Sequence, residues 1–279
     1  MNTKNEISEN VKKALEEDIG TGDVTTDLIE PHTIAEASLI SRDNAILCGI
    51  DWFNEVFNQL DNSIEIKWNA KDGDEIKKGE NLCVINGPAN SILTGERTAI
   101  NFIQTLSAVS TNVATFVSRI KNTKTKILDT RKTIPGLRYA QKYAVTTGGG
   151  INHRKGLYDE VLIKENHILA SGSIEKTISK AKEKKLPITI EVENLDQLKH
   201  ALETDVDRII LDNFTPPNIY KAVTITKGRI KLEASGNTTL NNVHIIAGTG
   251  VDYISIGALT KNIEAIDFSL LVNLVYIAR

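Results

Sequence analysis

Six basic residues stand in a stretch of the chain that contains no carboxylate. Between Arg131 and Tyr158 there is neither Asp nor Glu, and the charged or titratable side chains are Arg131, Lys132, Arg138, Lys142, His153, Arg154 and Lys155. Arg offers a planar pair of donors that suits carboxylate and phosphate groups. The glycines at 148–150 allow a backbone to approach a ligand closely. A solvated basic face is the plainer interpretation, but the pattern favours a site for a small, multiply charged anion.

Carboxylates follow at the ends of later apolar runs, at Glu191, Glu193, Asp212 and Glu233. Glu191 and Glu193 are two residues apart, so their side chains share one face of a strand. Carboxylates that face an anion-binding wall suggest a divalent cation with hard oxygen ligands, and therefore Mg²⁺. For any one of these carboxylates, a salt bridge to a neighbouring Lys or Arg is an equally good interpretation.

Loops of small residues come late in the chain, at Ser235–Thr239, at Gly248–Gly250 and at Gly257-Ala258. Late loops of this type are the usual phosphate site of a β/α barrel. Lys164 ends another apolar run and could form a Schiff base, as in barrel aldolases. That chemistry requires a lysine with a lowered pKa in an apolar setting, and the neighbours of Lys164 are polar.

The elements that must position these residues begin after residue 125, where short apolar runs repeatedly end in polar residues. The predicted strands are 127–128, 161–163, 188–192, 209–211, 230–232 and 253–256. Helix signals lie between them, including an N-cap at Asn194 with Gln197 three residues on, and Thr215 followed by Pro216. Alternating strands and helices imply parallel β/α units, in a barrel or a doubly wound sheet. The regular placement of polar residues at strand ends favours the barrel.

The first third of the chain has a different pattern. Residues 7–18 predict a short helix, whereas 35–40, 64–68 and 82–85 predict strands. This pattern resembles the hammerhead-like sandwich of biotinyl and lipoyl carrier domains, although an exposed hairpin lysine flanked by Asp or Met is not evident. From Gly95 the apolar period becomes helical, which predicts a long or broken helix starting at Gly95-Glu96-Arg97 and bridging two domains.

Composition narrows the class of protein. The 279 residues allow one large domain or two smaller ones, and 33 basic against 36 acidic residues argue against a general nucleic-acid binder. Tyr139, Tyr143 and Tyr158 are too irregular to suggest a single-strand stacking surface. The apolar runs fall short of the roughly 18 residues of a membrane span, and residues 1–20 lack the apolar core of a signal peptide. Cys48 and Cys83 lie in apolar runs and suggest buried thiols. We expect a cytoplasmic protein with neither nucleic-acid nor membrane partners.

Eight ordered motifs resemble quinolinate phosphoribosyltransferase, from about Asp18 almost to the C-terminus. They are Gly95–Asn101, Leu128–Arg138, Gly148–Arg154, Leu162–Ile168, Glu191–Glu193, Leu211–Phe214, Glu233–Asn237 and Ser255–Leu259. Asn237 stands where many members have a second glycine, although Ser-Gly-Asn also occurs in the family. The resemblance implies an α/β fold with an N-terminal α/β sandwich (hammerhead-like) domain and an incomplete β/α barrel. We place these domains at 1–108 and 109–264, with a C-terminal helix at 265–279 packing back on the first.

The resemblance also implies an activity and its residues. Quinolinate and phosphoribosyl pyrophosphate would give nicotinate mononucleotide, pyrophosphate and CO₂, with Mg²⁺, in de novo NAD biosynthesis. The enzyme would be a homodimer with shared active sites, or a hexamer. Quinolinate would be held by Arg131, His153, Arg154 and Lys164, with Arg97 of the partner subunit. The phosphoribosyl substrate would be held by Thr130, Lys132, Glu193, Asp212, Ser235, Gly236, Asn237, Ile256, Gly257 and Ala258. The expected catalytic residues are Lys132, Lys164, Glu193 and Asp212, and the expected metal ligands, directly or through water, are Glu193 and Asp212.

Three other interpretations stay open on the sequence. A nicotinate-specific phosphoribosyltransferase, or the quinolinate-like paralogue associated with molybdate transport, would share much of the pattern. Quinolinate has a second carboxylate, so a nicotinate enzyme would need fewer arginines, and the full set favours quinolinate. A carrier module in the first third and a barrel aldolase at Lys164 belong to other classes of protein.

Overall fold

The structure is a computed structural model and describes residues 3–30 and 32–275. The chain divides into two units. The first contains residues 1–112, 134–148 and 262–279, and the second contains 113–133 and 149–261. Of the described helices, none combines the length and the apolarity needed to cross a membrane.

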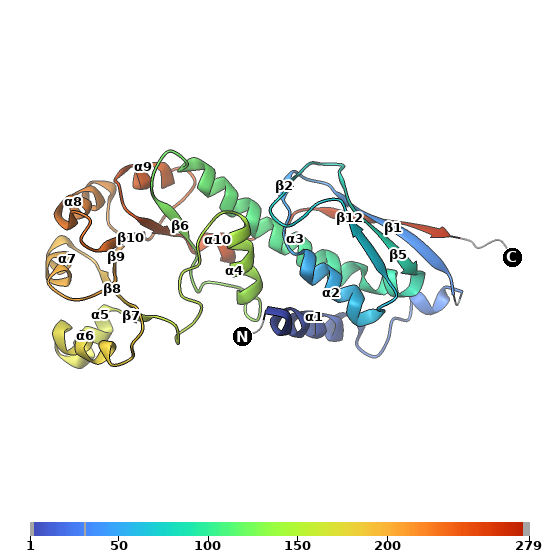
Figure 1. The fold of residues 1–279 in the computed structure, drawn as a ribbon, viewed down its shortest axis with the longest axis horizontal. Coiled ribbons are helices and arrows are strands. Elements are labelled where there is room, and N and C mark those ends of the chain that lie inside the picture. The colour runs from blue at the N-terminus through green and yellow to red at the C-terminus, as the bar shows by residue number, and fades with distance from the viewer. Residues whose placement is uncertain (1–2, 31, 276–279) are drawn as a thin grey trace. The chain divides into compact units, whose positions relative to one another are not determined.

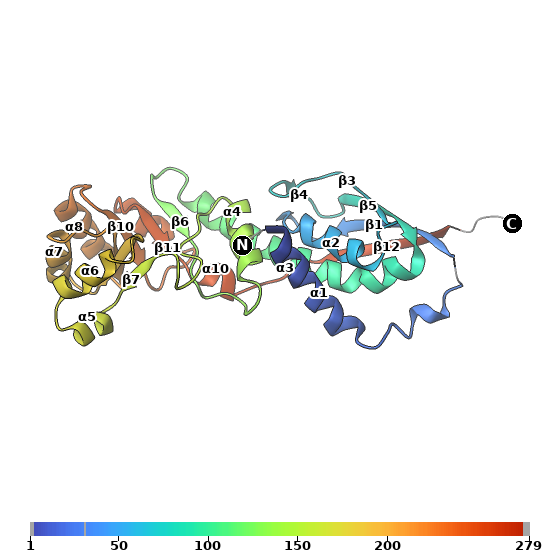
Figure 2. The ribbon, with the colours of Figure 1, turned by 60° about the horizontal axis from the view of Figure 1, so that its bottom comes forward.

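The first unit is built around an antiparallel sheet with the strand order β12-β1-β5-β3 (Figure 1). Its strands are β1 (Ile34–Ser41), β3 (Glu65–Trp68), β5 (Asn81–Pro88) and β12 (Phe268–Val275), and a separate pair is formed by β2 (Ala45–Ile46) and β4 (Glu75–Ile76). Its helices are α1 (Thr3–Ile19), the short 3-10 turn Thr26–Leu28, α2 (Ile50–Leu60), most of α3 (Ala89–Arg119) and α4 (Arg138–Thr147). In both ribbon views α1 lies beside α2 (Figures 1 and 2).

The core of the first unit is formed by apolar residues whose spacing matches the repeat of the strand or helix that carries them. Ala35, Ala37 and Leu39 alternate along β1 and are fully buried, which confirms the predicted strand. On α2, the Phe53 ring lies with its centroid 5.2 Å from that of Trp68. Cys48 and Cys83 are buried free thiols, as their apolar surroundings predict. The predicted helix at 7–18 and strands near 35–40, 64–68 and 82–85 are all present as α1, β1, β3 and β5.

The predicted helix at 265–279 is wrong. Residues 268–275 form β12, which pairs antiparallel along the whole length of β1. Phe268 and Leu270 are buried while Leu271 is half exposed, and this is the two-residue period of a strand on a sheet. Residues 276–279, the rest of the predicted helix, lie outside the described residues.

The predicted long helix is present as α3, but it begins at Ala89 rather than at Gly95. Gly95 therefore lies inside the helix, where it faces α2. A Cβ atom at this position would lie 2.8 Å from both Phe57 Cε1 and Leu60 Cδ1. The glycine thus allows the two helices of the first unit to approach closely.

We expect Gly95→Ala to lower the free energy of unfolding by about 1–2 kcal/mol, measured by urea denaturation. Overpacking typically costs about 1–3 kcal/mol, and two contacts at 2.8 Å favour the upper part of that range, about 2–3 kcal/mol. The roughly 1 kcal/mol that alanine gains over glycine in a helix offsets part of this cost. Gly248→Ala is the matched control, because Gly248 ends helix α9 (Val243–Gly248) and a Cβ there would meet no atom within 4 Å. A stability equal to or above that of the wild type would contradict the close packing of α3 on α2.

The second unit contains six parallel strands in the order β6-β11-β10-β9-β8-β7. They are β6 (Lys126–Leu128), β7 (Val161–Ile163), β8 (Ile188–Val192), β9 (Arg208–Asp212), β10 (Lys231–Ser235) and β11 (Tyr253–Ser255). The helices are α5 (Glu165–Ser171), α6 (Ile174–Lys182), α7 (Leu195–Leu202), α8 (Pro216–Thr226), α9 and α10 (Ala258–Lys261), together with the end of α3. All six predicted strands are therefore present. Asn194 caps α7 as predicted, accepting hydrogen bonds from the backbone N–H groups of Asp196 and Gln197.

The strand order distinguishes a barrel from a doubly wound sheet. From β7 to β11 each strand lies beside the next one in the chain, without the reversal of direction that defines a doubly wound sheet. Strand β6 lies beyond β11, which is the place that the first strand of a barrel takes. The pairing stops between β6 and β7, so this is an incomplete β/α barrel (Figure 1).

Candidate functional site

The register of the second unit's sheet brings polar residues into rows on one of its faces. Glu191 on β8 is paired with Ile210 on β9, which is paired with Glu233 on β10. One step toward the carboxyl ends, on the same face, Asp212 is paired with Ser235. Residues of the opposite face, such as Leu211 and Ala234, are buried and apolar. The polar face is therefore the face that lines the inside of the incomplete barrel. The predicted site residues lie at the carboxyl ends of its strands.

Asp212 and the Ser235-Gly236-Asn237 loop meet at the ends of β9 and β10. The backbone N–H of Asn213 donates to the Ser235 carbonyl oxygen at 2.8 Å, and Asn237 Nδ2 donates to Asn213 Oδ1 at 3.4 Å. Gly236 has φ of +101°, and a Cβ there would lie 2.1 Å from Asn213 Oδ1. Only glycine fits this position, so the loop's conformation depends on it.

A second group of predicted residues meets where β6 and β11 end. The backbone N–H of Lys132 donates to Thr130 Oγ1 at 3.0 Å, and Thr260 Oγ1 donates to the Lys132 carbonyl oxygen at 2.8 Å. A Cβ at Gly257 would lie 2.8 Å from Lys132 Cδ. The Lys132 side chain therefore runs over the 256–258 loop, as expected for residues that serve one ligand.

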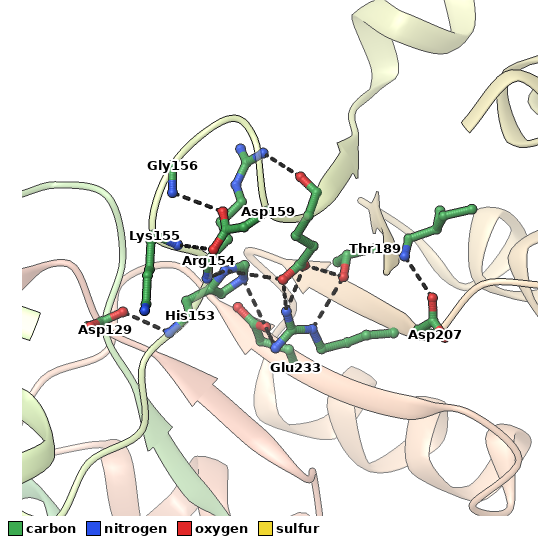
Figure 3. Close-up of polar contacts among 12 residues, drawn as sticks. Asp129, His153, Arg154, Lys155, Gly156, Asp159, Thr189, Asp207 and Glu233 are labelled. Carbon is green, nitrogen blue, oxygen red and sulfur yellow. Dashed lines mark hydrogen bonds and ion pairs between the residues drawn. The ribbon is translucent and has the colours of Figure 1, made fainter. Parts of the chain in front are cut away.

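The loop between β6 and β7 carries His153 and Arg154. The His153 backbone N–H donates to Oδ1 of the buried Asp129 at 2.8 Å, and the Arg154 backbone N–H donates to His153 Nδ1 at 2.7 Å (Figure 3). Burial, and after it the charge of Arg131, lowers the pKa of Arg154, while the carboxylates of Glu160 and Asp159 oppose this shift. Two guanidinium groups thus lie within electrostatic reach of each other, which is the arrangement that binds an anion.

Lys164 follows β7 and is ion-paired in this structure. Its Nζ donates to both carboxylate oxygens of Glu191, at 2.8 Å each. The salt-bridge interpretation is therefore correct for Glu191. A Schiff-base lysine is activated by an apolar setting, and the paired, half-exposed Lys164 does not have one.

Glu193 and Asp212 end neighbouring strands. Val192, the last residue of β8, is paired with Leu211, so Glu193 follows β8 next to the end of β9, where Asp212 is the last residue. Within the described residues, no group of three or more His, Cys, Asp or Glu side chains forms a metal-binding cluster. Mg²⁺ is commonly held by one or two carboxylates together with substrate phosphates. The pair fits a cation that enters with a phosphorylated substrate, and it does not form a cage for a resident metal.

The basic stretch is divided between the two units. Arg138 and Lys142 belong to α4 in the first unit, whereas Arg131, Lys132, Arg154 and Lys155 belong to the second. Within the second unit alone, the predicted basic stretch is therefore represented by these four cations. Arg97 also lies in the first unit, on α3, with an exposed side chain.

Sequence reasoning missed Glu160 and Arg208, and it placed Glu233 after a strand rather than inside one. Glu233 lies within β10 and is buried. Arg208 donates to both carboxylate oxygens of Glu160, at 2.7 and 2.9 Å. The sequence could have indicated Arg208 through the two-residue repeat of a strand, because this repeat puts Arg208 on the same face of β9 as Ile210 and Asp212.

Comparisons with known proteins show the family of the chain. The profile described as "Quinolinate phosphoribosyl transferase, N-terminal domain" matches residues 23–107, and the one described as "Quinolinate phosphoribosyl transferase, C-terminal domain" matches residues 109–271. The chain belongs to the quinolinate phosphoribosyltransferase family. Members of this family are phosphoribosyltransferases, so the chain is an enzyme of that type.

Named relatives of the family cover nearly the whole chain. The chain is 41% identical to the "Probable nicotinate-nucleotide pyrophosphorylase [carboxylating]" of Bacillus subtilis (strain 168), over 92% of this chain and 90% of that protein. It is 39% identical to the chloroplastic "Nicotinate-nucleotide pyrophosphorylase [carboxylating]" of Arabidopsis thaliana, over 94% and 82%. The solved structure of the nicotinate-nucleotide pyrophosphorylase from Francisella tularensis has a TM-score of 0.95 and 47% identity, and covers 98% of each chain.

Proposed function

We propose that this chain transfers the phosphoribosyl group of phosphoribosyl pyrophosphate to quinolinate and releases pyrophosphate and CO₂, giving nicotinate mononucleotide. Membership of the quinolinate phosphoribosyltransferase family supports the reaction. The observation that carries the substrate assignment is the similarity to relatives named nicotinate-nucleotide pyrophosphorylase [carboxylating] and quinolinate phosphoribosyltransferase [decarboxylating], and the guanidiniums of Arg131 and Arg154 in the second unit fit it. A dianion with two adjacent carboxylates suits such a pair.

In this proposal, the quinolinate carboxylates are bound by Arg131, Arg154 and Lys164, with His153 beside them. Lys164 exchanges part of its contact with Glu191 for the substrate, which its half-exposed ammonium allows. Arg97 of the partner subunit completes the site in a homodimer. The exposed position of Arg97, on a unit other than the one that carries these residues, supports a contribution across an interface.

In the same proposal, the phosphoribosyl substrate is held at the carboxyl ends of β6, β9, β10 and β11. Lys132 and the 256–258 loop form one contact region, and Asp212 with the 235–237 loop forms the other. Backbone N–H groups of such small-residue loops are suited to phosphate, because no side chain blocks the approach. Glu193 and Asp212 would hold Mg²⁺ directly or through water, and the ion would neutralise pyrophosphate charge as that group leaves.

The chain's residues act on this chemistry by position and charge. When the C1–oxygen bond to pyrophosphate breaks, positive charge develops on the ribose, and the carboxylates of Glu193 and Asp212 would stabilise it directly or through Mg²⁺. The pyridine nitrogen of quinolinate, held by the arginines, then bonds to C1 and becomes a pyridinium. The adjacent carboxylate leaves as CO₂, its electron pair stays at C2, and C2 takes up a proton. The ring itself accepts the electrons, so no organic cofactor is needed.

Two further properties belong to the same proposal. We infer an assembly of at least two subunits, either a dimer or a hexamer, because Arg97 serves the site of its partner. We also infer a cytoplasmic location, and the buried free thiols of Cys48 and Cys83 support a reducing compartment.

The test is an assay of the purified chain with quinolinate, phosphoribosyl pyrophosphate and Mg²⁺, with nicotinate mononucleotide and CO₂ measured as products. We expect both products in equal amounts, and we expect their loss on addition of EDTA and their return with excess Mg²⁺. Nicotinate in place of quinolinate is the control for the nicotinate-specific alternative. A folded chain that turns over nicotinate but not quinolinate would overturn the assignment.

A further inference from the structure

The ring of His153 lies near the buried carboxylate of Glu233 (Figure 3) and near the partly buried carboxylate of Glu160, both in the second unit. Its Nε2 is 3.4 Å from Oε2 of Glu233, and its Nδ1 is 4.0 Å from Oε2 of Glu160. Nδ1 accepts the Arg154 backbone N–H, and Nε2 faces Glu233. Glu233 is only 1% exposed and the His153 side chain 9%. The ring is therefore held through Nδ1 by the Arg154 backbone N–H, and its Nε2 lies against the buried carboxylate of Glu233.

Arg208 joins these two carboxylates. Its Nη2 donates to both oxygens of Glu160, at 2.7 and 2.9 Å, and its Nη1 lies 3.3 Å from Oε2 of Glu233. Its Nε donates to Thr189 Oγ1 at 3.3 Å, and Thr189 Oγ1 donates to Glu160 Oε1 at 2.5 Å. Its guanidinium also lies over the ring of Tyr253. Arg208 is thus held by contacts from β8, β10, β11 and the segment before β7.

The same network reaches Arg154. The Glu160 carbonyl oxygen accepts a hydrogen bond from Arg154 Nη1 at 3.2 Å. The segment 153–160 is therefore tied to the sheet at one end through His153 and Asp129, and at the other through Glu160 and Arg208. Two of the residues proposed to contact quinolinate, His153 and Arg154, lie on this segment.

We propose that Arg208 is a positioning residue for quinolinate binding, acting through Glu160 and Glu233 on His153 and Arg154. The inference rests on the proposed function. A buried and a partly buried carboxylate beside an anion site would repel the substrate, and one guanidinium in contact with both reduces that repulsion while fixing their geometry. A bidentate Arg–carboxylate pair is directional, so it holds the segment in one register on the sheet.

The test compares Arg208→Met with Lys231→Met by steady-state kinetics in both substrates, quinolinate binding by calorimetry and thermal unfolding. Lys231 is the matched control, because it is paired with Arg208 in the sheet register but forms an exposed ion pair with Asp252. We expect Arg208→Met to raise the quinolinate KM about 10–100-fold, as residues that orient a binding group typically do. We expect the phosphoribosyl pyrophosphate KM to stay within about twofold, and Lys231→Met to change neither constant.

Removing Arg208 alone leaves a buried and a partly buried carboxylate and could prevent folding. The double variant Arg208→Met/Glu160→Gln removes one charge of each sign and keeps the net charge of the cluster. We expect it to fold and still to show the raised quinolinate KM, with partial recovery in Arg208→Lys. An active wild type together with a double variant whose quinolinate KM and affinity are unchanged would overturn the positioning role alone. A folded wild type without quinolinate turnover would overturn the proposed function first and this role with it.

Discussion

Arg154→Ala is expected to lower kcat/KM for quinolinate by about 10²–10⁴-fold while the protein remains folded. Two charge-assisted hydrogen bonds to a carboxylate are lost, each worth roughly 1.5–3 kcal/mol, and every 1.4 kcal/mol is tenfold. The loop should keep its shape, because it is held by backbone N–H bonds to Asp129 and His153 Nδ1 that the substitution leaves in place. Arg131→Ala is expected to have an effect of the same order for the same reason.

Lys155→Ala provides the matched control for Arg154→Ala. It removes one positive charge at the next position of the same loop, on an exposed residue whose backbone N–H donates to Asp159 Oδ2. We expect kcat/KM within about threefold of the wild type, because a rim charge acts mainly through long-range attraction. Circular dichroism and thermal unfolding establish that each variant is folded. Wild-type activity in Arg154→Ala would remove this residue from the site.

The second large effect is expected from Arg97→Ala, which should be nearly inactive alone and regain activity when mixed with Arg131→Ala. If the site is shared, a mixed dimer has one site in which both arginines are intact. Random exchange makes half of the dimers mixed, so about a quarter of the wild-type activity should return in a symmetric dimer. The measurement is turnover after co-refolding or co-expression of the two variants.

The control for this complementation is a mixture of Arg131→Ala with Arg154→Ala. Both residues belong to the second unit, so every site in the mixed dimer keeps one defect, and activity should not return. Differently tagged chains verify that subunits exchange. Verified exchange without recovery in the Arg97→Ala mixture would place Arg97 outside the neighbouring site.

The second unit could be predicted in detail from the sequence, because its signals are local. Each apolar run of β6 to β11 buries side chains on the outer face and ends in polar residues at one edge of the sheet. The error at 268–275 has the opposite cause. Leu270, Leu271 and Leu274 fit a helical face as well as a strand, and the pairing of this segment with β1, more than 200 residues earlier, decides between them.

In the candidate site, too, the residues that lie in local motifs could be predicted and those held by distant partners could not. Gly236, Gly257 and the cations of the β6 and β7 loops are in motifs, so the sequence locates them. Arg208 and Glu160 are 48 residues apart, and each resembles an ordinary surface charge beside a strand. Only the register of β9 turns Arg208 toward the inner face, where it meets Glu160 and Glu233. Partnerships between distant charges depend on tertiary structure and leave no local pattern.

The place of β12 in the sheet has a consequence for how the chain is made. The sheet of the first unit receives this strand from residues 268–275, after the whole second unit has left the ribosome. Until then β1 has a partner on one side only, and its free edge can pair with other chains. The second unit, in contrast, has all its strands by residue 255, ahead of β12. The sheet that begins the chain is therefore completed by the strand that is made last, and one edge of β1 stays open until then.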